Sequence, residues 1–279
     1  MISLLIPCCN QIDQLKRYLS PLLSQIDFGI FTQIIIVDDA SHDGSSDYIS
    51  SHFPDIHLII NKEFLGFARS LNRGFFVSKN KLVLILPPFG LIKSFNLEKL
   101  QDFTANKNKA ILLPYTYTRS SSQSELRCPD VQVSFQYGTL TINKRYARFR
   151  EGETGLCLLE NLMLLKKEIW EENDGFCTAF FPIGFELCDM ALKIRKKKLE
   201  ISHTEALICE VMTSSDLKSL YSPTQLEAIH AKNELLLFWR HGSGFWMWIL
   251  HLLRLLSAFL LFKIRQNRIL FLALRSLLY

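Results

Sequence analysis

Four apolar runs alternate with helical stretches in the first 90 residues, and this alternation restricts the fold more than any other feature of the chain. The runs have the length of strands, and the segments between them have the spacing of amphipathic helices. The predicted strands are 2–7, 33–39, 56–61 and 81–87, and the predicted helices are 11–26, 47–53 and 66–78. Strands that are apolar throughout and joined by helices are typical of a parallel sheet covered on both faces. The sequence therefore predicts an α/β fold with a mostly parallel, mixed sheet.

The remaining two thirds of the chain is less regular. A strand or hairpin is predicted at 131–142 and a helix near 187–198. We expect two halves of one domain, at 1–110 and 111–215, followed by a C-terminal helical segment at 216–279.

Charge and cysteine content exclude some classes of function. The chain has 32 basic and 27 acidic residues, a balance that does not indicate nucleic acid, and we expect none as a partner. Its seven cysteines form no C-x-x-C pair, so we expect free thiols in a reducing cytosol and no zinc site.

Polar residues follow the predicted strands, at the edge where a parallel sheet binds ligands. Asp38 and Asp39 come directly after the second strand. Ionised carboxylates only accept hydrogen bonds, so these two could bind a base or ribose hydroxyls, and Asp39 is the preferred candidate. Asp43 precedes Gly44 and Ser45 and is expected to cap the next helix instead.

The segment FLGFARSLNRG follows the third strand. Gly66 allows the backbone to bend, and the helix that begins there is expected to direct free N–H groups toward a bound anion. Arg69 and Arg73 lie one helical turn apart. They either face a diphosphate or form a solvated pair on the surface.

The C-terminal segment changes character, because 245–262 read FWMWILHLLRLLSAFLLF. A membrane-spanning helix needs about 20 apolar residues, and His251 and Arg254 interrupt this run. We favour an amphipathic helix in the plane of a membrane surface, with Trp246 and Trp248 at its edge. A helix packed on the domain or on a partner, and a true span, are the alternatives. The polar side of the helix is predicted to carry His251, Arg254, Ser257, Arg265, Arg268 and Arg275.

Three segments in the first 90 residues, IPCCN, IIIVDDASHDGS and NKEFLGFARSLNRG, together resemble the nucleotide-binding half of the family 2 glycosyltransferases, which have a GT-A fold. The family pattern is a strand ending P-x-x-N, then V-D-D-x-S-x-D-G-S, then N-x-G-F-A-x-x-x-N-x-G. The resemblance implies that Pro7, Asn10 and Asp39 hold the base and ribose of a nucleotide. The candidate nucleotide-binding residues are Pro7, Asn10, Asp38, Asp39, Gly66, Arg69 and Asn72.

A fainter resemblance continues at 175–201, which contains Glu186 and Asp189. These two match the outer acids of the family's E-D-x-D segment, while the central acid, often the base that activates the acceptor, is Leu187 here. Glu186 is the first candidate for a catalytic base and Asp189 the second. Either acid could instead be structural, since Lys193 follows Asp189 by one helical turn.

The family's fourth strand ends in acids that hold a divalent metal, usually Mn or Mg. This chain has Pro87, Pro88 and Phe89 there, and none of these side chains can ligate a hard cation. Glu210, near the family's later metal ligand, is a single remaining candidate. We therefore predict no metal site, so that Arg69, Arg73 or Lys62 would have to stabilise the leaving diphosphate.

The resemblance implies transfer of a sugar from a nucleotide-sugar donor to a glycan or lipid-linked acceptor in polysaccharide or glycolipid synthesis, without a metal. The enzyme would be peripheral to the cytosolic face of a membrane. The alternative is a catalytically inactive GT-A-like protein that binds nucleotide, glycan or a partner glycosyltransferase. A membrane-bound scaffold would leave the Asp38–Asp39 turn without a role.

Overall fold

The computed structural model describes residues 1–119, 124–137, 139–147, 162–182, 184–211, 221–260, 269 and 273–274. Their contacts divide the chain into two compact units. The first unit comprises Met1–Val131 with Lys144–Ser214, and the second comprises Gln132–Asn143 with Ser215–Tyr279. Both predicted halves, 1–110 and 111–215, contribute strands to the sheet of the first unit.

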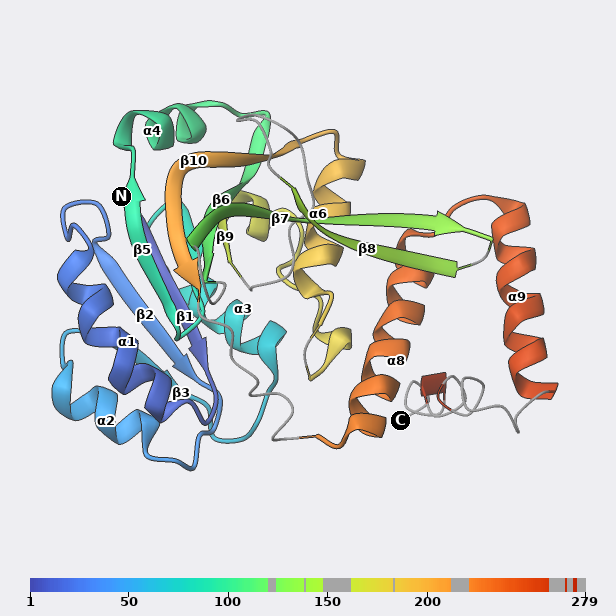
Figure 1. Cartoon of the computed structure of the whole chain (residues 1–279), viewed down its shortest axis with the longest axis horizontal. Coiled ribbons are helices and arrows are strands. Elements are labelled where there is room, and N and C mark those ends of the chain that lie inside the picture. Colours follow the sequence, from blue (N-terminus) through green and yellow to red (C-terminus); the bar gives the residue numbers. More distant parts are fainter. Residues whose placement is uncertain are drawn as a thin grey trace. The chain divides into compact units, whose positions relative to one another are not determined.

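The first unit is built on a mixed sheet (Figure 1). Its order is β3 (His57–Ile60), β2 (Gln33–Asp38), β1 (Ile2–Cys8), β4 (Leu82–Ile85), β9 (Met163–Lys166), β6 (Lys109–Arg119), β10 (Glu200–Val211) and β5 (Gly90–Phe95). The first four strands are parallel, β9 is antiparallel to both of its neighbours, β10 is parallel to β6, and β5 is antiparallel to β10. From β6 the sheet continues into β7 (Ser124–Gln136) and β8 (Thr139–Ala147). The predicted α/β class is confirmed.

Helices cover both faces of this sheet. The apolar side chains of α1 (Ile12–Gln25), α2 (Ser45–His52) and α4 (Leu97–Ala105) share one buried cluster. Those of α3 (Phe67–Val77), α5 (Lys167–Glu171) and α6 (Glu186–Lys196) share the other. A short 3₁₀ helix, η1 (Thr178–Phe180), precedes α6.

Alternation along the strands explains why the apolar runs are continuous. Successive side chains of a strand point to opposite faces. In β1, Leu4 and Ile6 enter the first cluster and Leu5 enters the second. A strand with helices on both sides therefore needs apolar residues at every position.

The second unit contains α8 (Pro223–His241) and α9 (Phe245–Leu260). Ser222 and Gln225 form a capping box that starts α8. Among the helices described, none has both the length and the apolar character needed to cross a membrane.

One prediction about α9 is wrong, because His251 does not lie on an exposed polar side. It is 2% exposed, stacks on Phe238 with ring centroids 4.1 Å apart, and accepts a hydrogen bond at its Nε2 from the indole of Trp239 at 2.9 Å. Aromatic packing between α8 and α9 buries the imidazole. Of the other residues assigned to the polar side, Arg254 and Ser257 are exposed, whereas Arg265, Arg268 and Arg275 lie outside the described residues.

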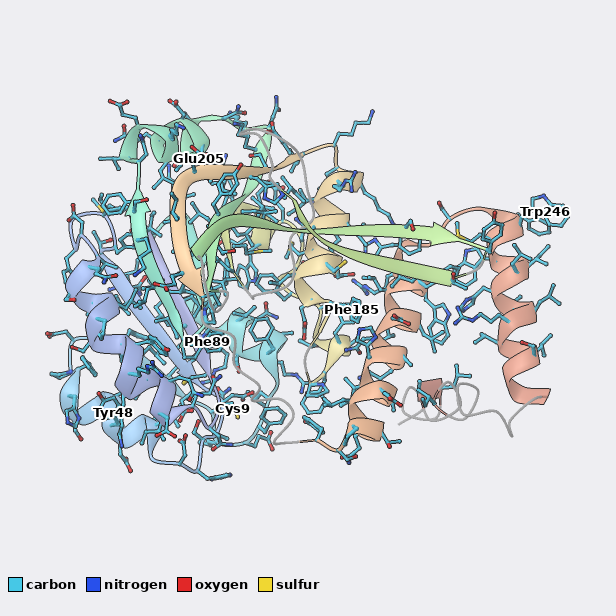
Figure 2. All side chains as sticks on the ribbon, viewed as in Figure 1. Cys9, Tyr48, Phe89, Phe185, Glu205 and Trp246 are labelled. Carbon is cyan, nitrogen blue, oxygen red and sulfur yellow. The ribbon has the colours of Figure 1, made fainter. Side chains whose placement is uncertain are left out.

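The exposed surface of α9 is instead rich in large apolar side chains. Trp246, labelled in Figure 2, extends from the first turn and is 74% exposed. The other exposed members are Phe245, Leu250, Leu252, Leu253 and Leu256. We call these six residues the α9 apolar face.

Candidate functional site

The polar ends of the strands meet at one edge of the sheet. Because β1, β2, β4 and β10 run in the same direction, their carboxyl ends lie at the same edge, where open α/β sheets bind ligands. Cys9, directly after β1, and Phe89, after β4, are labelled in Figure 2. We call this the ligand edge.

Asp38 supports the ligand edge from inside the protein. Its side chain is fully buried, and its Oδ1 accepts hydrogen bonds from the Ser41 hydroxyl and, at 3.8 Å, from the Cys8 thiol. Its Oδ2 has no hydrogen-bond partner in the described part of the chain. Burial raises the pKa of Asp38, although the hydrogen bonds from Ser41 and Cys8 oppose this effect. In this conformation Asp38 shapes the turn but is inaccessible to a nucleotide.

Asn10 joins the first two loops of the ligand edge. Its backbone N–H donates to the Ser41 hydroxyl at 2.8 Å, and its side-chain oxygen accepts from the His42 N–H at 2.8 Å. Asn10 has φ 51°, a left-handed conformation that Asn tolerates better than most residues, and its side chain is exposed. Pro7, by contrast, is buried within β1 opposite Val37. Of these two predicted nucleotide-binding residues, Asn10 is therefore the accessible one.

Asp43 has the structural role predicted for it, and it supports a second helix as well. Its Oδ1 accepts from the Ser45 N–H at 3.0 Å and hydroxyl at 2.6 Å, at the first residue of α2. Its Oδ2 accepts from the N–H of Ile12, the first residue of α1, at 2.8 Å. Burial raises the pKa of Asp43, but the hydrogen bonds from Ser45 and Ile12 outweigh it and hold the pKa below its usual value.

Asp39 is held by three donors from the loop after β3. Its Oδ1 accepts from Asn61 Nδ2 at 2.7 Å and from the Leu65 N–H at 2.8 Å, and its Oδ2 accepts from the Gly66 N–H at 2.8 Å. A carboxylate has about four lone-pair sites, so one acceptor position remains for a ligand. The side chain is only 4% exposed.

These contacts limit the expectation of free N–H groups at the start of α3 to the donors that follow Phe67. The donors of Leu65 and Gly66 already bind the carboxylate of Asp39, and the N–H of Phe67 donates to the carbonyl of Pro182 at 2.9 Å. The chain's own carboxylate takes the place that a ligand anion would take at a helix N-terminus.

Arg73 and Arg69 differ in how firmly they are held. Arg73 donates from Nη1 to Asn61 Oδ1, and the amide of Asn61 donates in turn to Asp39 and, at 3.0 Å, to Ser70 Oγ. Arg69, one turn earlier, is exposed. Arg73 is exposed as well but supports the Asp39 loop, whereas Arg69 forms no such hydrogen bond to that loop among the described residues.

Asn72 joins α3 to α5 and to the segment that follows α5. Its Oδ1 accepts from the Trp170 indole at 2.9 Å and from the Phe176 N–H at 2.8 Å, and its Nδ2 donates to the Phe176 carbonyl at 2.9 Å. Both ends of the amide are engaged within the protein. We therefore leave Asn72 out of the proposed nucleotide site.

Gly66 brings the segment before α6 against the loop that binds Asp39. Its φ of +82° is unfavourable for other residues, and a Cβ there would lie 2.7 Å from the Pro182 carbonyl and 2.7 Å from the Phe181 ring. Beside this contact, Phe64 and Phe181 pack edge to face with centroids 5.6 Å apart. Residues that precede the acids of α6 and residues that bind Asp39 therefore meet at Gly66.

We expect Gly66→Ala to destabilise the protein by about 2–4 kcal/mol, because the methyl group clashes with backbone and the conformation is strained. Gly44→Ala is the comparison variant, since Gly44 also has a positive φ, of +86°, but its ψ of 12° lies in the left-handed helical region and its Cβ would meet only a side-chain atom at 3.6 Å. Urea denaturation of both variants measures the difference. Equal losses of stability would show that neither the contact with Pro182 nor the ψ of 168° at Gly66 adds to the cost of a positive φ.

Glu186 and Asp189 both lie in the first turn of α6 and are both buried. Glu186 is 2% exposed, and its Oε2 accepts from the Gly184 N–H at 2.7 Å. Asp189 forms an ion pair with Lys193 at 3.3 Å, the structural pairing that the spacing allowed. Leu187, at the position of the family's central acid, packs in the second cluster. A carboxylate at that position would be buried among apolar side chains.

The residues at the end of β4 do not fit a divalent metal. Pro87 and Pro88 are buried, and Phe89 packs against the first cluster. Glu210, the remaining candidate, forms an ion pair with Lys93 at 2.6 Å. Within the described residues, no three His, Cys, Asp or Glu side chains come together as metal ligands would. The donor set at this edge therefore gives no support to the metal that the resemblance implies.

Sequence reasoning missed the roles of Lys93, Ser41 and Pro182. Ser41 lies in the quoted Asp turn, and its spacing from Asp38 suits a local hydrogen bond, so this contact could have been anticipated. The partners of Lys93 and Pro182 lie more than 100 residues away along the chain, and no local pattern signals them.

Comparisons with known proteins concern the family and the fold of the chain. Residues 3–153 match the family model described as Glycosyl transferase family 2. A search of curated proteins gave no match.

Three solved structures illustrate the shared fold. GalNAc-T7 with UDP, GalNAc and Mn2+ has a TM-score of 0.62 and 11% identity over 84% of this chain, which spans only 50% of that protein. The mannosyltransferase PcManGT from Pyrobaculum calidifontis, in complex with GDP-Man and Mn2+, has a TM-score of 0.56 and 13% identity, covering 100% of this chain and 87% of its own. Residues 1–349 of S. aureus TarS in complex with UDP-GlcNAc have a TM-score of 0.54 and 13% identity, and the match covers 87% of this chain and 68% of the TarS chain.

Proposed function

The chain belongs to glycosyl transferase family 2, and on this premise we propose that it transfers a sugar from a nucleotide-sugar donor to a glycan or lipid-linked acceptor. One observation carries the proposal: Gly66 joins the loop that binds Asp39 to the segment that leads into Glu186. A donor-binding turn and a candidate base are thereby connected at one edge of the sheet. Solved structures with this fold hold UDP, UDP-GlcNAc or GDP-Man.

The nucleotide is proposed to bind over the first two loops of the ligand edge. Asn10 is accessible there, and the remaining acceptor position of Asp39 suits a base N–H or a ribose hydroxyl. Asp38 and Pro7 are buried beneath these loops and support them. Gly66 holds the loop after β3 in place. Lys62, within that loop, and Arg69, on α3, are exposed and add positive charge.

Transfer then requires one displacement at the anomeric carbon. A bond forms from the acceptor oxygen to this carbon, and the bond to the nucleoside diphosphate breaks, leaving its electron pair on the phosphate oxygen. Glu186 takes the proton of the acceptor hydroxyl. Asp189, neutralised by Lys193, fixes the first turn of α6 and so orients Glu186.

Titration calorimetry tests the proposal directly. The protein is titrated with UDP, GDP, dTDP and CMP, each with and without Mn2+. We expect one of these nucleotides to bind with an affinity that Mn2+ leaves unchanged, because the residues at the end of β4 do not fit a metal. Binding that requires Mn2+ would refute our assignment of the metal position, and no binding would refute the donor site.

The competing function is a family member that binds nucleotide or a partner glycosyltransferase without catalysis. The burial of Glu186 and Asp189 favours it, since a catalytic base must reach the acceptor hydroxyl. This function would be supported if the protein binds a nucleotide but neither transfers the sugar of the corresponding nucleotide sugar nor slowly hydrolyses that nucleotide sugar.

We further propose that the protein acts at the cytosolic face of a membrane, in polysaccharide or glycolipid synthesis, and that it attaches through the α9 apolar face. Exposed apolar surface of this kind marks interaction sites, and a Trp at its edge suits the membrane interface. From 235 to 279 the chain has no acidic residue, and its bases would favour anionic lipid. These bases are Arg240, Arg254, Lys263, Arg265, Arg268 and Arg275.

Replacing Trp246 and Leu253 together with serine is expected to reduce binding to vesicles at least tenfold, because both side chains would enter the lipid. Co-sedimentation with phosphatidylcholine vesicles containing phosphatidylglycerol measures this. Phe76→Ser is the control, since Phe76 is 78% exposed on α3, away from α9 in the chain. Equal binding by the double variant would exclude the α9 apolar face as the attachment surface.

A further inference from the structure

We propose that Lys93 supplies the positive charge that stabilises the leaving nucleoside diphosphate, at the place where the residues do not fit a metal. This inference rests on the proposed transferase function and names a residue that the sequence motifs do not mark. Three features of the first unit support it, namely a β-bulge, the position of β5 and the ion pair with Glu210. The charge balance of the reaction is the fourth argument.

A β-bulge places Lys93 out of register in β5. Cys209 of β10 pairs with Ile92, but the next residue, Ile208, pairs with Ser94. Lys93 is therefore the extra residue, with no partner in the ladder. Bulges turn a side chain away from its regular direction and are frequent next to active sites.

The start of β5 lies directly at the end of β4. The Gly90 N–H donates to the Pro87 carbonyl at 2.9 Å, which closes a tight turn over Pro88 and Phe89. A Cβ on Gly90 would lie 2.6 Å from the Leu86 side chain, so glycine allows the close approach. The next residue, Leu91, pairs with Glu210. Glu210 thus lies opposite the first residue after the turn, and this turn contains the residues that stand where the family has acids.

Glu210 holds the ammonium group of Lys93 at this position. Their side chains are 17% and 37% exposed, and the Nζ to Oε2 distance is 2.6 Å. A lysine ammonium has three N–H donors, of which Glu210 accepts one. The cation is therefore fixed by a neighbouring strand yet accessible to solvent, whereas Lys62 and Arg69 are exposed and form no ion pair within the described ranges of the chain.

The reaction requires a cation of this kind. As the bond between the anomeric carbon and the phosphate oxygen breaks, its electron pair and the negative charge stay on the terminal phosphate. A charged N–H donor directed at that oxygen stabilises the charge as it develops. The proton of Lys93 is shared in the hydrogen bond and is not transferred, so no further reactant is needed.

The test compares nucleotides that do and do not carry the terminal phosphate. Wild type, Lys93→Met and Lys93→Arg are each titrated with UDP, GDP, dTDP and the matching monophosphates, with and without Mn2+. We expect Lys93→Met to weaken binding of the diphosphate roughly 10- to 100-fold and that of the monophosphate less than twofold. Lys93→Arg is expected to retain most of the affinity, because it keeps the charge.

Lys107→Met is the matched control, since Lys107 is exposed between α4 and β6. The thermal transition of Lys93→Met shows whether this variant is folded. If the folded variant binds the diphosphate as tightly as wild type does, the role of Lys93 is overturned while the donor site stands. Equal weakening for the monophosphate would also overturn it. If wild type binds no nucleotide, the proposed function and this inference fall together.

Discussion

Asp39→Ala is expected to reduce the free energy of unfolding by about 3–5 kcal/mol and to abolish nucleotide binding, because three donors lose their acceptor at once. Asn61, Leu65 and Gly66 all donate to this carboxylate, which is nearly inaccessible to water. Without it, the N–H groups of Leu65 and Gly66, just before α3, lose their acceptor, and the helix N-terminus loses a nearby negative charge.

Urea denaturation and nucleotide titration check this prediction together. Asp55→Ala is the control, since Asp55 is exposed in a turn and its loss should change stability by less than about 0.5 kcal/mol. A stable Asp39→Ala variant that binds nucleotide as well as wild type would contradict both the structural role of Asp39 and the position of the donor site. A stable variant with lost binding would mean that Asp39 acts only on the ligand.

Glu186→Gln is expected to lower sugar transfer about 10²- to 10⁴-fold, the usual contribution of a general base. Donor affinity and stability should change little, because a glutamine oxygen can still accept from the Gly184 N–H as Glu186 does. Turnover and nucleotide titration of the same protein preparation give both quantities.

Asp189→Asn distinguishes the two acids of α6. Asp189 is buried beside Lys193, so its replacement leaves a cation without its charge partner and should cost stability. If Glu186 is the base, the folded Asp189→Asn protein keeps most of its turnover. Loss of turnover in Asp189→Asn but not in Glu186→Gln would assign the base to Asp189, and full turnover in both would exclude these acids as the base.

The two predictions distinguish the active and the inactive protein. If this protein binds nucleotide but is inactive, Asp39→Ala would still lower the affinity for nucleotide. Glu186→Gln would then have no turnover to reduce. The structural part of the Asp39 prediction holds in either case, because it depends only on hydrogen bonds within the protein.

Much of the fold follows from local patterns in the sequence. The predicted strand 33–39 corresponds to β2, and the predicted helix 66–78 corresponds to α3. Both carry a strong hydrophobic period and begin or end at polar turns, which are the most reliable signals in a single sequence. The helix α8, by contrast, was not predicted as a separate element, although Ser222, Pro223 and Gln225 form a recognisable start signal.

The candidate site was less predictable, since the same residue type can serve a ligand or the protein itself. The sequence predicts that Asp39 binds a nucleotide, but it does not reveal that three of the acceptor positions of this carboxylate serve the loop after β3. His251 was placed on a polar face by its helical spacing, but a neighbouring helix supplies an aromatic partner for it. Spacing within one helix does not reveal what packs against that helix.

The sequence by itself determined the α/β class, the positions of the polar turns and the loss of acids at Pro87–Pro88–Phe89, because each depends on residues close together in the chain. Only the tertiary structure decided how those turns are used. The ion pair of Lys93 with Glu210 and the contact of Gly66 with Pro182 each join residues more than 100 positions apart. Such pairs form only when the sheet brings distant strand ends to one edge, where charge and close packing select their partners.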